Sequence, residues 1–394
     1  MKKTKDILEK KIIAVCHFSL TSFTEHLEEY LVQRKIERFF IIQHPLHPIP
    51  GRSQSVSRMY KKGKLQKKKI ANVSSVLNGW NYIKASLLTI WWVLISKEQW
   101  DLYVGNNGLN TVAGLILKRL GKVKTVVFYS VDFVPSRFNN STLNAIYHWV
   151  DKISVIYSDK VWLLSPRMVR GRREYLGLDK KYDEKQILFP EGVWIDRIHR
   201  ATDKEVKKDV AIFVGTLVKR MGVQLVIESI PYILKKIPNF KLIIIGKGPY
   251  RTDLEKLIDK LDLGDHVVFK GFVESHREIE NIVATCAVGL AAYTTDESGL
   301  TFYADPAKTK LYLGSGIPIV MTDSFYNAHD IADAGAGVLV KDNETEIAKG
   351  ILKIIGSKKE LSNFRKNAIK FAGKFDWPLL FEVNLNRIFK EKSK

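Results

Sequence analysis

Short apolar runs rich in β-branched residues alternate with helix-length amphipathic segments along the whole chain of 394 residues. This alternation is typical of βαβ units, in which helices join parallel strands and pack on the faces of the sheet. In the first half the expected strands are 11–16, 38–43, 102–104, 125–129, 160–164 and 186–188. A second series is expected at 210–214, 241–245, 266–269, 288–291, 317–321 and 337–339. The predicted fold class is therefore α/β, with two separate parallel sheets.

Two sheets and a chain of this length predict two domains, and two domains imply a cleft. Residues 196–209 are polar and charge-rich and lack apolar periodicity, which is typical of a linker. We expect an N-terminal domain at 1–198, a linker at 199–209, a C-terminal domain at 210–374, and a last helical segment at 375–394 that crosses back to the first domain.

Basic residues are concentrated in the first half of the chain. Residues 1–200 hold 34 Lys and Arg against 17 Asp and Glu, whereas residues 201–394 hold 29 against 25. No acidic residue lies between Glu37 and Glu98, and an aromatic cluster lies in the second part of this segment and just after it: Trp80, Tyr82, Trp91, Trp92 and Trp100. A cationic and aromatic face predicts docking on an anionic membrane surface. The alternative is a core helix followed by a solvated lysine loop.

Several classes of protein are disfavoured by the composition. The two cysteines, Cys16 and Cys286, stand in apolar strand-like runs, which indicates buried thiols in a reducing, cytoplasmic compartment. The longest apolar run, 87–95, is too short to span a bilayer, and the charged N-terminus is unlike a signal peptide. We find no zinc, helix-turn-helix or RNA-recognition pattern, so no nucleic acid is expected. An Asp-X-Asp pair at a strand end is also missing, so no metal is expected.

Glycines follow the first two strands of the second series. The first strand runs into Gly215-Thr216 and then Lys219-Arg220 before a helix, and the second runs into Gly246-Lys-Gly248. A glycine at a strand end allows a tight turn and exposes the amides of the following helix, which bind phosphate. The two loops could face one diphosphate site, although such glycines also occur for packing alone.

Two further segments lie at the ends of later strands in the second half. The turn that contains Phe272 and Val273 could present backbone groups to a flat base, or it could be an ordinary strand-to-helix turn. The segment from Glu297 to Asp305 and Lys308 gathers acidic groups and a lysine at a helix start, where they could orient sugar and ribose hydroxyls. These positions complete the predicted donor site.

The order of these motifs resembles the C-terminal domain of GT-B glycosyltransferases, specifically glycosyltransferase family 4, over about residues 205–385. The resemblance implies two Rossmann-like domains facing across a cleft, a nucleoside-diphosphate sugar as co-substrate, and retention of anomeric configuration. It also implies that the basic residues bind the diphosphate, that Phe272 and Val273 contact the base, and that Glu297 and Asp305 contact sugar and ribose.

The chain departs from the family pattern at four positions. Thr216 and Met221 stand where the family commonly has Arg and Lys, so Lys219 or Arg220 is expected to serve instead. Leu311 stands at the usual place of the second Glu, and Val131 replaces a His. These departures leave open an inactive relative that acts as a scaffold.

The N-terminal half offers candidates for the acceptor side. His17 and Ser19 follow its first strand, Asn106 follows a later strand, and Glu191 follows its last strand. Asp132 remains from the family's His-Asp pair and is the candidate for contacting the acceptor hydroxyl or accepting its proton. An Asx turn or helix cap before Pro135 is the structural alternative.

The sequence thus predicts a cytoplasmic glycosyltransferase, with peripheral attachment to the inner face of the cell membrane as one alternative. It would move a sugar from a nucleoside-diphosphate sugar to a glycolipid or polysaccharide precursor, without a metal. The catalytic candidates are Asp132 and Glu297. The alternatives are a sugar-nucleotide epimerase of GT-B-like fold and a non-enzymatic basic protein that binds membranes or nucleic acid.

Overall fold

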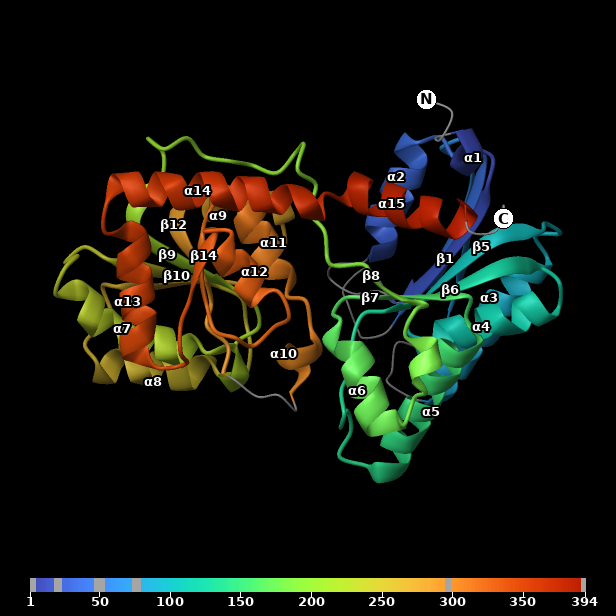
Figure 1. Ribbon diagram of the computed structural model, residues 1–394, viewed down its shortest axis with the longest axis horizontal. Helices are drawn as coiled ribbons and strands as arrows, with labels where there is room; N and C mark the ends of the chain where they lie inside the picture. Colours follow the sequence, from blue (N-terminus) through green and yellow to red (C-terminus); the bar gives the residue numbers. More distant parts are fainter. Residues whose placement is uncertain (1–4, 18–22, 46–53, 73–78, 295–298, 391–394) are drawn as a thin grey trace. The chain divides into compact units, whose positions relative to one another are not determined.

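The computed structural model describes residues 5–17, 23–45, 54–72, 79–294 and 299–390, and its chain divides into two compact units. The first unit contains Met1–Phe189 and Pro378–Lys394, and the second contains Pro190–Trp377. Each unit is built around one sheet with helices on both faces (Figure 1). The predicted α/β fold class is therefore confirmed.

The first unit has an eight-stranded sheet in the order β4-β3-β2-β1-β5-β6-β7-β8. Its strands are β1 (Lys11–His17), β2 (Arg38–His44), β3 (Ser55–Lys61), β4 (Lys64–Ala71), β5 (Trp100–Asn106), β6 (Val123–Ser130), β7 (Lys160–Leu163) and β8 (Gln186–Leu188). Six strands are parallel, while β3 and β4 form an antiparallel hairpin at the edge. The order of the strands reverses between β1 and β5, since the strands after β1 are added first on one side of it and then on the other, and open α/β sheets bind ligands at such a switch point.

Helices cover both faces of this sheet. They are α1 (Lys5–Leu8), α2 (Phe23–Gln33), α3 (Gly79–Leu94), α4 (Gly108–Arg119), α5 (Ser141–Tyr157), α6 (Arg167–Leu176) and α15 (Trp377–Lys390). α4 contacts both α3 and α5, so these three form one layer. α15 lies beside α2, because the Phe381 ring contacts those of Phe23 and Tyr30 (Figure 1). The last helix thus returns to the first unit.

The second unit has a fully parallel sheet in the order β11-β10-β9-β12-β13-β14, the Rossmann order. Its strands are β9 (Lys207–Val214), β10 (Lys241–Ile245), β11 (Val267–Gly271), β12 (Cys286–Ala291), β13 (Ile319–Met321) and β14 (Gly337–Leu339). Its helices are α7 (Val223–Leu234), α8 (Arg251–Lys260), α9 (His276–Ala284), α10 (Leu300–Tyr303), α11 (Ala307–Gly314), α12 (Ala328–Asp333), α13 (Glu344–Ile355) and α14 (Lys358–Ala372). The switch point lies between β9 and β12.

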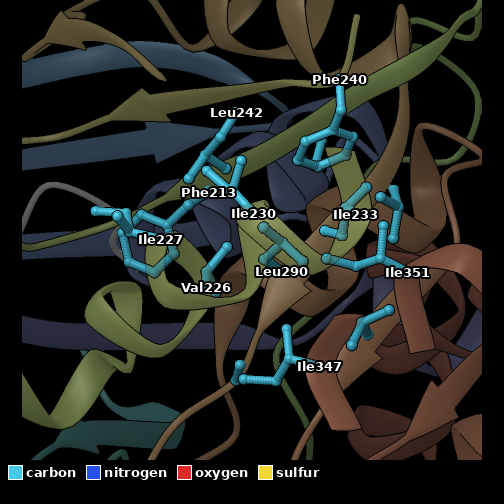
Figure 2. Packing of buried hydrophobic residues seen from close by; sticks show 14 of the residues in the cluster. Phe213, Val226, Ile227, Ile230, Ile233, Phe240, Leu242, Leu290, Ile347 and Ile351 are labelled. Carbon is cyan, nitrogen blue, oxygen red and sulfur yellow. The ribbon is translucent and has the colours of Figure 1, made fainter. Parts of the chain in front are cut away.

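Buried aliphatic and aromatic residues hold α7 and α13 against one face of this second sheet. Ile227 and Ile230 of α7 pack with Ile351 of α13 and with Phe213 and Leu290 of the strands (Figure 2). All five side chains are at most 1% exposed. This core fixes the strand ends from which the glycine loops leave.

The chain passes from the first unit to the second between Phe189 and Pro190, whereas the sequence prediction placed a linker at 199–209. The segment after Pro190 is hydrogen-bonded into the second unit: Glu191 N donates to Asp305 and Val193 N to the Phe375 carbonyl. β9 also begins at Lys207. Polar composition alone could not reveal these bonds.

Candidate functional site

The two predicted glycine loops lie directly against each other at the carboxyl ends of β9 and β10. Gly215 N donates to the Ile245 carbonyl at 2.9 Å, and Leu217 N donates to the Lys247 carbonyl at 3.1 Å. A Cβ on Gly246 would lie 1.9 Å from the Gly215 carbonyl oxygen, and the φ of Gly246 is 141°. Only glycine fits this approach. The loops therefore form one backbone surface, as predicted.

Lys308, near the start of α11, brings its ammonium to these loops. Its Nζ is buried and, among the described residues, has no hydrogen-bond partner. It lies 3.9 Å from the centre of the Phe213 ring and 4.9 Å from that of Tyr293. A Cβ on Gly215 would lie 3.1 Å from it. The ammonium thus faces the first glycine loop and is held over two aromatic rings.

Burial lowers the pKa of Lys308 to about 7. The cause is desolvation, because the charged ammonium has lost its water without gaining hydrogen bonds. A buried donor in this state costs free energy that a bound acceptor can recover. An anion is the partner that this ammonium fits best, and the first glycine loop beside it leads to the N-terminal end of α7, which carries a positive partial charge.

The remaining donor candidates surround the same strand ends. Lys219 and Arg220 are exposed in a short 3-10 turn before α7, whose N-terminal partial charge is positive, and Thr216 is exposed just before them. The Phe272 ring, 44% exposed, lies 4.6 Å from Lys247 Nζ of the second loop. Gly248 is in the second glycine loop, and Val273 follows Phe272 in the turn after β11. The structure brings these residues together, and their binding roles stay predictions.

Asp305 is engaged inside the protein. Its buried carboxylate forms an ion pair with Lys310 and accepts a hydrogen bond from Glu191 N at 2.8 Å. Burial raises its pKa, and the Lys310 charge opposes that shift. Burial and the nearby Asp305 charge raise the pKa of Glu191 to about 8. Glu191, predicted on the acceptor side, therefore belongs to the second unit and supports the segment that bears Lys308.

In the first unit, His17 lies at the end of β1, at the switch point beside β5. Its Nδ1 accepts from the side-chain amides of Asn107, at 3.0 Å, and Asn110, at 3.1 Å. Because an amide nitrogen only donates, the proton of the imidazole is on Nε2. Nε2 is buried and has no hydrogen-bond partner in the part of the chain that the structure describes. Burial lowers the pKa of His17 to about 4, so it is neutral.

Neutral polar and aromatic groups surround this imidazole. The His44 ring is 5.8 Å from it and the Tyr82 ring 5.3 Å from it. Burial first, and the neighbouring His17 second, lower the pKa of His44 to about 3. The backbone carbonyl of Asn106 accepts a hydrogen bond from the side-chain amide of Asn110 at 2.7 Å and so helps to hold the amide that contacts His17. This strand end offers an uncharged N–H donor rather than a charge.

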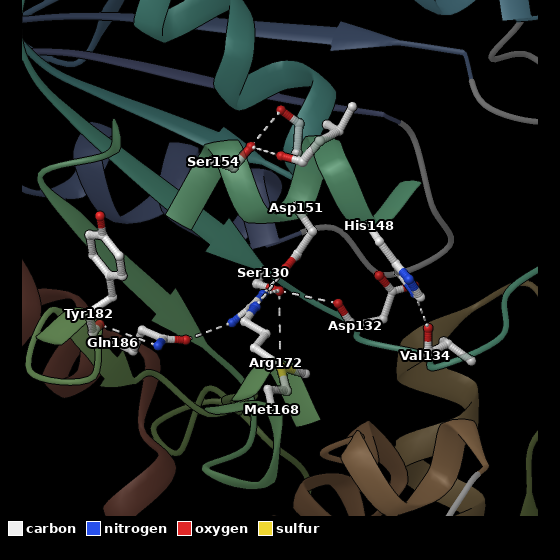
Figure 3. Close-up of polar contacts among 12 residues, drawn as sticks. Ser130, Asp132, Val134, His148, Asp151, Ser154, Met168, Arg172, Tyr182 and Gln186 are labelled. Atoms are coloured by element: carbon white, nitrogen blue, oxygen red, sulfur yellow. Dashed lines mark hydrogen bonds and ion pairs between the residues drawn. The ribbon is translucent and has the colours of Figure 1, made fainter. Parts of the chain in front are cut away.

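Asp132 follows β6 and is partly exposed. Its carboxylate accepts from Arg137 Nη1 at 2.5 Å, and its carbonyl accepts from Ser130 Oγ at 3.2 Å. Ser130 Oγ in turn accepts from Arg172 Nη2 at 2.7 Å, and Arg172 pairs with Asp151 at 2.7 and 2.9 Å (Figure 3). A buried ion pair thus sets the backbone of the candidate catalytic residue.

Two predicted residues, Ser19 and Glu297, lie outside the described residues. The sequence analysis missed Asn110, Arg172 and Lys310. Asn110 could have been found from its place three residues after Asn107 at a helix start, since that spacing brings side chains to one face. Arg172 gives no local signal, because its partner Asp151 is 21 residues away.

Residues 195–371 match the family model "Glycosyl transferases group 1". An alpha-monoglucosyldiacylglycerol synthase of Acholeplasma laidlawii is 28% identical over 202 residues, 48% of each chain. A GDP-mannose-dependent alpha-(1-6)-phosphatidylinositol monomannoside mannosyltransferase of Mycolicibacterium smegmatis is 23% identical over 173 residues, 40% of this chain and 44% of the relative. The aligned part spans less than half of each of these two relatives.

Solved structures match nearly the whole chain. A sucrose-phosphate synthase (tll1590) from Thermosynechococcus elongatus superposes with a TM-score of 0.73 at 15% identity, covering 97% of this chain and 99% of that one. Anabaena Alr3699/HepE in complex with UDP gives a TM-score of 0.66 at 15% identity, covering 96% and 99%. These matches establish the shared fold of both units.

Proposed function

Since the chain has the GT-B glycosyltransferase fold and carries a glycosyl transferases group 1 region, we propose that it moves a sugar from a nucleoside-diphosphate sugar to an acceptor hydroxyl. The observation that carries this proposal is the Lys308 ammonium, buried without a hydrogen-bond partner among the described residues and beside two facing glycine loops. The leaving diphosphate supplies the anion that this arrangement lacks.

The chemistry follows from where charge develops. As the bond between the sugar and the diphosphate breaks, negative charge grows on the leaving oxygen, and groups that meet it there stabilise the transition state. Lys308, the loop amides and the exposed Lys219 and Arg220 provide positive potential at one strand end. We propose that these groups replace a divalent metal in this task. Retention of configuration is proposed from the family match alone.

The acceptor is proposed to be a glycolipid or polysaccharide precursor that is recognised in the first unit. His17 offers a buried, neutral N–H, and the side chains that orient it are amides. Such a group suits a sugar or glycerol hydroxyl, which both donates and accepts. Asp132, held by Arg137, is the proposed base for that hydroxyl. The names of both relatives described above contain a glycolipid, monoglucosyldiacylglycerol in one and phosphatidylinositol monomannoside in the other.

We propose that the first unit docks on the inner face of the cell membrane. Four exposed side chains of α3 recur at helical spacing: Trp80, Ile83, Leu87 and Trp91. Trp92 and Trp100 are buried, so the aromatic cluster of the sequence divides into core and surface. An apolar helical stripe next to a lysine-rich hairpin suits an anionic bilayer surface. Within the described residues, no helix has the length and apolar content to cross a membrane.

The test is a thermal-shift panel of UDP, GDP, ADP, TDP and CMP, each with and without EDTA. A nucleotide at a hundred times its dissociation constant adds about 2.7 kcal/mol, which moves the melting temperature by several degrees. One nucleotide should stand out, independently of EDTA. Lys308→Met should weaken the shift, while Lys260→Met, on exposed α8 of the same unit, should not. If no nucleotide stabilises the protein, the proposal fails.

With the selected donor, the anomeric configuration of the product is read by NMR before it equilibrates. A product with the configuration of the donor supports retention, and the opposite configuration overturns it. Loss of transfer on EDTA treatment, restored by added magnesium, would overturn the proposed independence from metals.

A further inference from the structure

A cavity lies in the first unit between the β3–β4 hairpin and α3. Its apolar walls are Phe40 of β2, Met59 of β3, and Trp92 and Ile95 of the α3 region. Its volume is about 120 Å³. An apolar cavity of about 150 Å³ holds a benzene molecule, so this one fits a short length of acyl chain.

The strand register explains why the walls face the same way. Phe40 pairs with Met59, and Met59 with Lys67, while Ser57 pairs with Lys69. Residues that are paired across strands, or two apart on one strand, point to the same face of a sheet. All five therefore face α3. The other face of the hairpin is directed to α2, where Arg58 pairs with Glu28.

Polar groups at this cavity point to an anion. Lys67 and Lys69 line it together, and Ser57 Oγ, buried in the wall, has no hydrogen-bond partner among the described residues. Burial lowers the pKa of Lys69, and the charge of Lys67 lowers it further, so the two ammonium groups repel each other. An anion between them would remove that repulsion and give the hydroxyl an acceptor.

The cavity therefore combines an apolar interior with a cationic mouth. We infer that it binds one anionic phospholipid, with the phosphate between Lys67 and Lys69 and the start of an acyl chain against Trp92 and Met59. A free phosphate would leave the apolar walls unused, and a neutral lipid would leave the lysines unused. The exposed α3 residues Leu87 and Trp91 are on the helix that forms one wall, which allows a bilayer to supply the lipid.

This site shares no residue with the candidate acceptor site but adjoins it, because the Trp92 ring in its wall stacks on the His44 ring. The cavity lies at the middle of β2, at Phe40, whereas His17 and His44 occupy the carboxyl ends of β1 and β2. The inference rests on the membrane docking proposed above, and it does not require sugar transfer. It assigns the recognition of charged lipid to a built pocket rather than to diffuse surface charge.

The experiment uses the full chain and dihexanoyl phosphatidylglycerol below its micelle concentration, followed by calorimetry. Dihexanoyl phosphatidylcholine and glycerol phosphate serve as probes that lack, respectively, the net charge and the chains. We expect the anionic lipid to bind at least tenfold more tightly than either. If glycerol phosphate binds equally well, or if the two lipids are equivalent, the inference is overturned.

Variants locate the site. The double variant Lys67→Gln/Lys69→Gln should bind the anionic lipid about 25-fold more weakly, at roughly fivefold for each lysine. Lys64→Gln with Lys68→Gln removes the same charge from the same strand and should change binding less than twofold. Ile95→Trp fills the cavity and should abolish lipid binding. Equal loss in both double variants would overturn the inference.

The nucleotide panel, run on the same variants, separates this inference from the proposed function. The nucleotide shift should persist in Lys67→Gln/Lys69→Gln, which also reports that the variant is folded. If the short-chain lipid fails to bind while vesicles and the nucleotide still bind, only the pocket is refuted. If vesicles also fail to bind, the proposed membrane docking is refuted together with the pocket.

Discussion

The two units place their candidate sites at the same topological position and fill it with opposite chemistry. At the switch point of the second sheet stand Gly215 and the Lys308 ammonium, whose pKa is about 7. At that of the first sheet stands His17, neutral with a pKa of about 4 and oriented by two amides. Among the described residues, the Lys308 ammonium lacks a counter-ion, whereas the His17 imidazole has an N–H that lacks a hydrogen-bond acceptor. The same fold thus places a buried ammonium at one switch point and a buried neutral imidazole at the other, and we propose that the first meets an anion and the second a hydroxyl.

The two units also differ in how many large apolar side chains and basic residues they expose or contain. Among the described residues, all but three of the exposed large apolar side chains belong to the first unit, the exceptions being Tyr232, Val268 and Phe272. The excess of basic residues is also in the first half. The unit with the neutral imidazole therefore also has the more apolar and more basic exterior, which agrees with the proposed recognition of a lipid-linked hydroxyl there.

Each unit also holds a buried ion pair behind its site, Asp151–Arg172 in the first and Asp305–Lys310 in the second. Arg172→Met should lower the free energy of unfolding by about 3–5 kcal/mol, because it leaves Asp151 buried and uncompensated. Urea denaturation measures this loss. Arg173→Met is the control: its pair with Asp183 is at the surface, and we expect at most about 1 kcal/mol. A loss below 1 kcal/mol for Arg172→Met would show that the pair does not support the Asp132 loop.

The different pKa values of Lys308 and His17 predict that ligand binding depends on pH at the Lys308 site and not at the His17 site. Above pH 7 the unliganded Lys308 loses its proton, so affinity for the selected nucleoside diphosphate should fall by up to about tenfold per pH unit. Calorimetry between pH 7.5 and 9 measures this, and proton uptake on binding should accompany it. Lys308→Met should bind about 10–100-fold more weakly at pH 7 and should lose the slope. A slope that persists in this variant would assign the titration to another group.

Without nucleotide, the same group affects stability with a definite sign. The folded pKa of about 7 lies below the usual 10.5, so between these values the unfolded chain binds more protons. The free energy of unfolding should therefore rise with pH across that window, by at most about 1.4 kcal/mol per unit, and Lys308→Met should remove the rise. Urea denaturation at pH 7.5 and 9.5 measures the difference.

Much of this comparison was predictable from the sequence. Buried parallel strands are continuous apolar runs, so the strand centres around Ile13, Ile244 and Leu290 were placed correctly. The glycines after β9 and β10 were also informative, because their approach excludes any Cβ. Local patterns sufficed wherever a residue's role is fixed by its own strand.

The rest depended on partners distant in sequence. The β3–β4 hairpin was not predicted, because β4 is almost wholly exposed and its lysines hide any apolar alternation. Asp305 was assigned to the donor, but its carboxylate also accepts from Glu191 N, a partner 114 residues away that is brought to it only when the segment after Pro190 is hydrogen-bonded into the second unit. Exposed strands and long-range polar pairs leave little trace in one sequence.

The first unit's site is tested by His17→Phe, which keeps an aromatic ring of similar shape and removes the N–H. We expect the KM for the acceptor to rise about 5–10-fold, since one neutral hydrogen bond is lost, while nucleotide affinity stays unchanged. The wild-type acceptor KM should be flat between pH 6 and 8, because His17 stays neutral there. Asn110→Ala, which removes one amide that orients the imidazole, should shift the KM in the same direction by less. If His17→Phe changed the nucleotide affinity instead, the proposal that the first unit binds the acceptor and the second unit binds the nucleotide would be wrong.

The smallest effect concerns the surfaces. Trp91, 60% exposed on α3, should contribute about 1 kcal/mol to docking, so Trp91→Ser should weaken binding to anionic vesicles about fivefold. Because the side chain packs little in the folded protein, stability should change by less than about 0.5 kcal/mol. Tyr232→Ser, at an exposed aromatic position of the second unit, is the matched control and should leave vesicle binding intact. Flotation with vesicles of anionic and zwitterionic lipid measures both. Equal effects from the two variants would mean that the apolar exterior of the first unit has no special part in docking, and the contrast between the units would then rest on their sites alone.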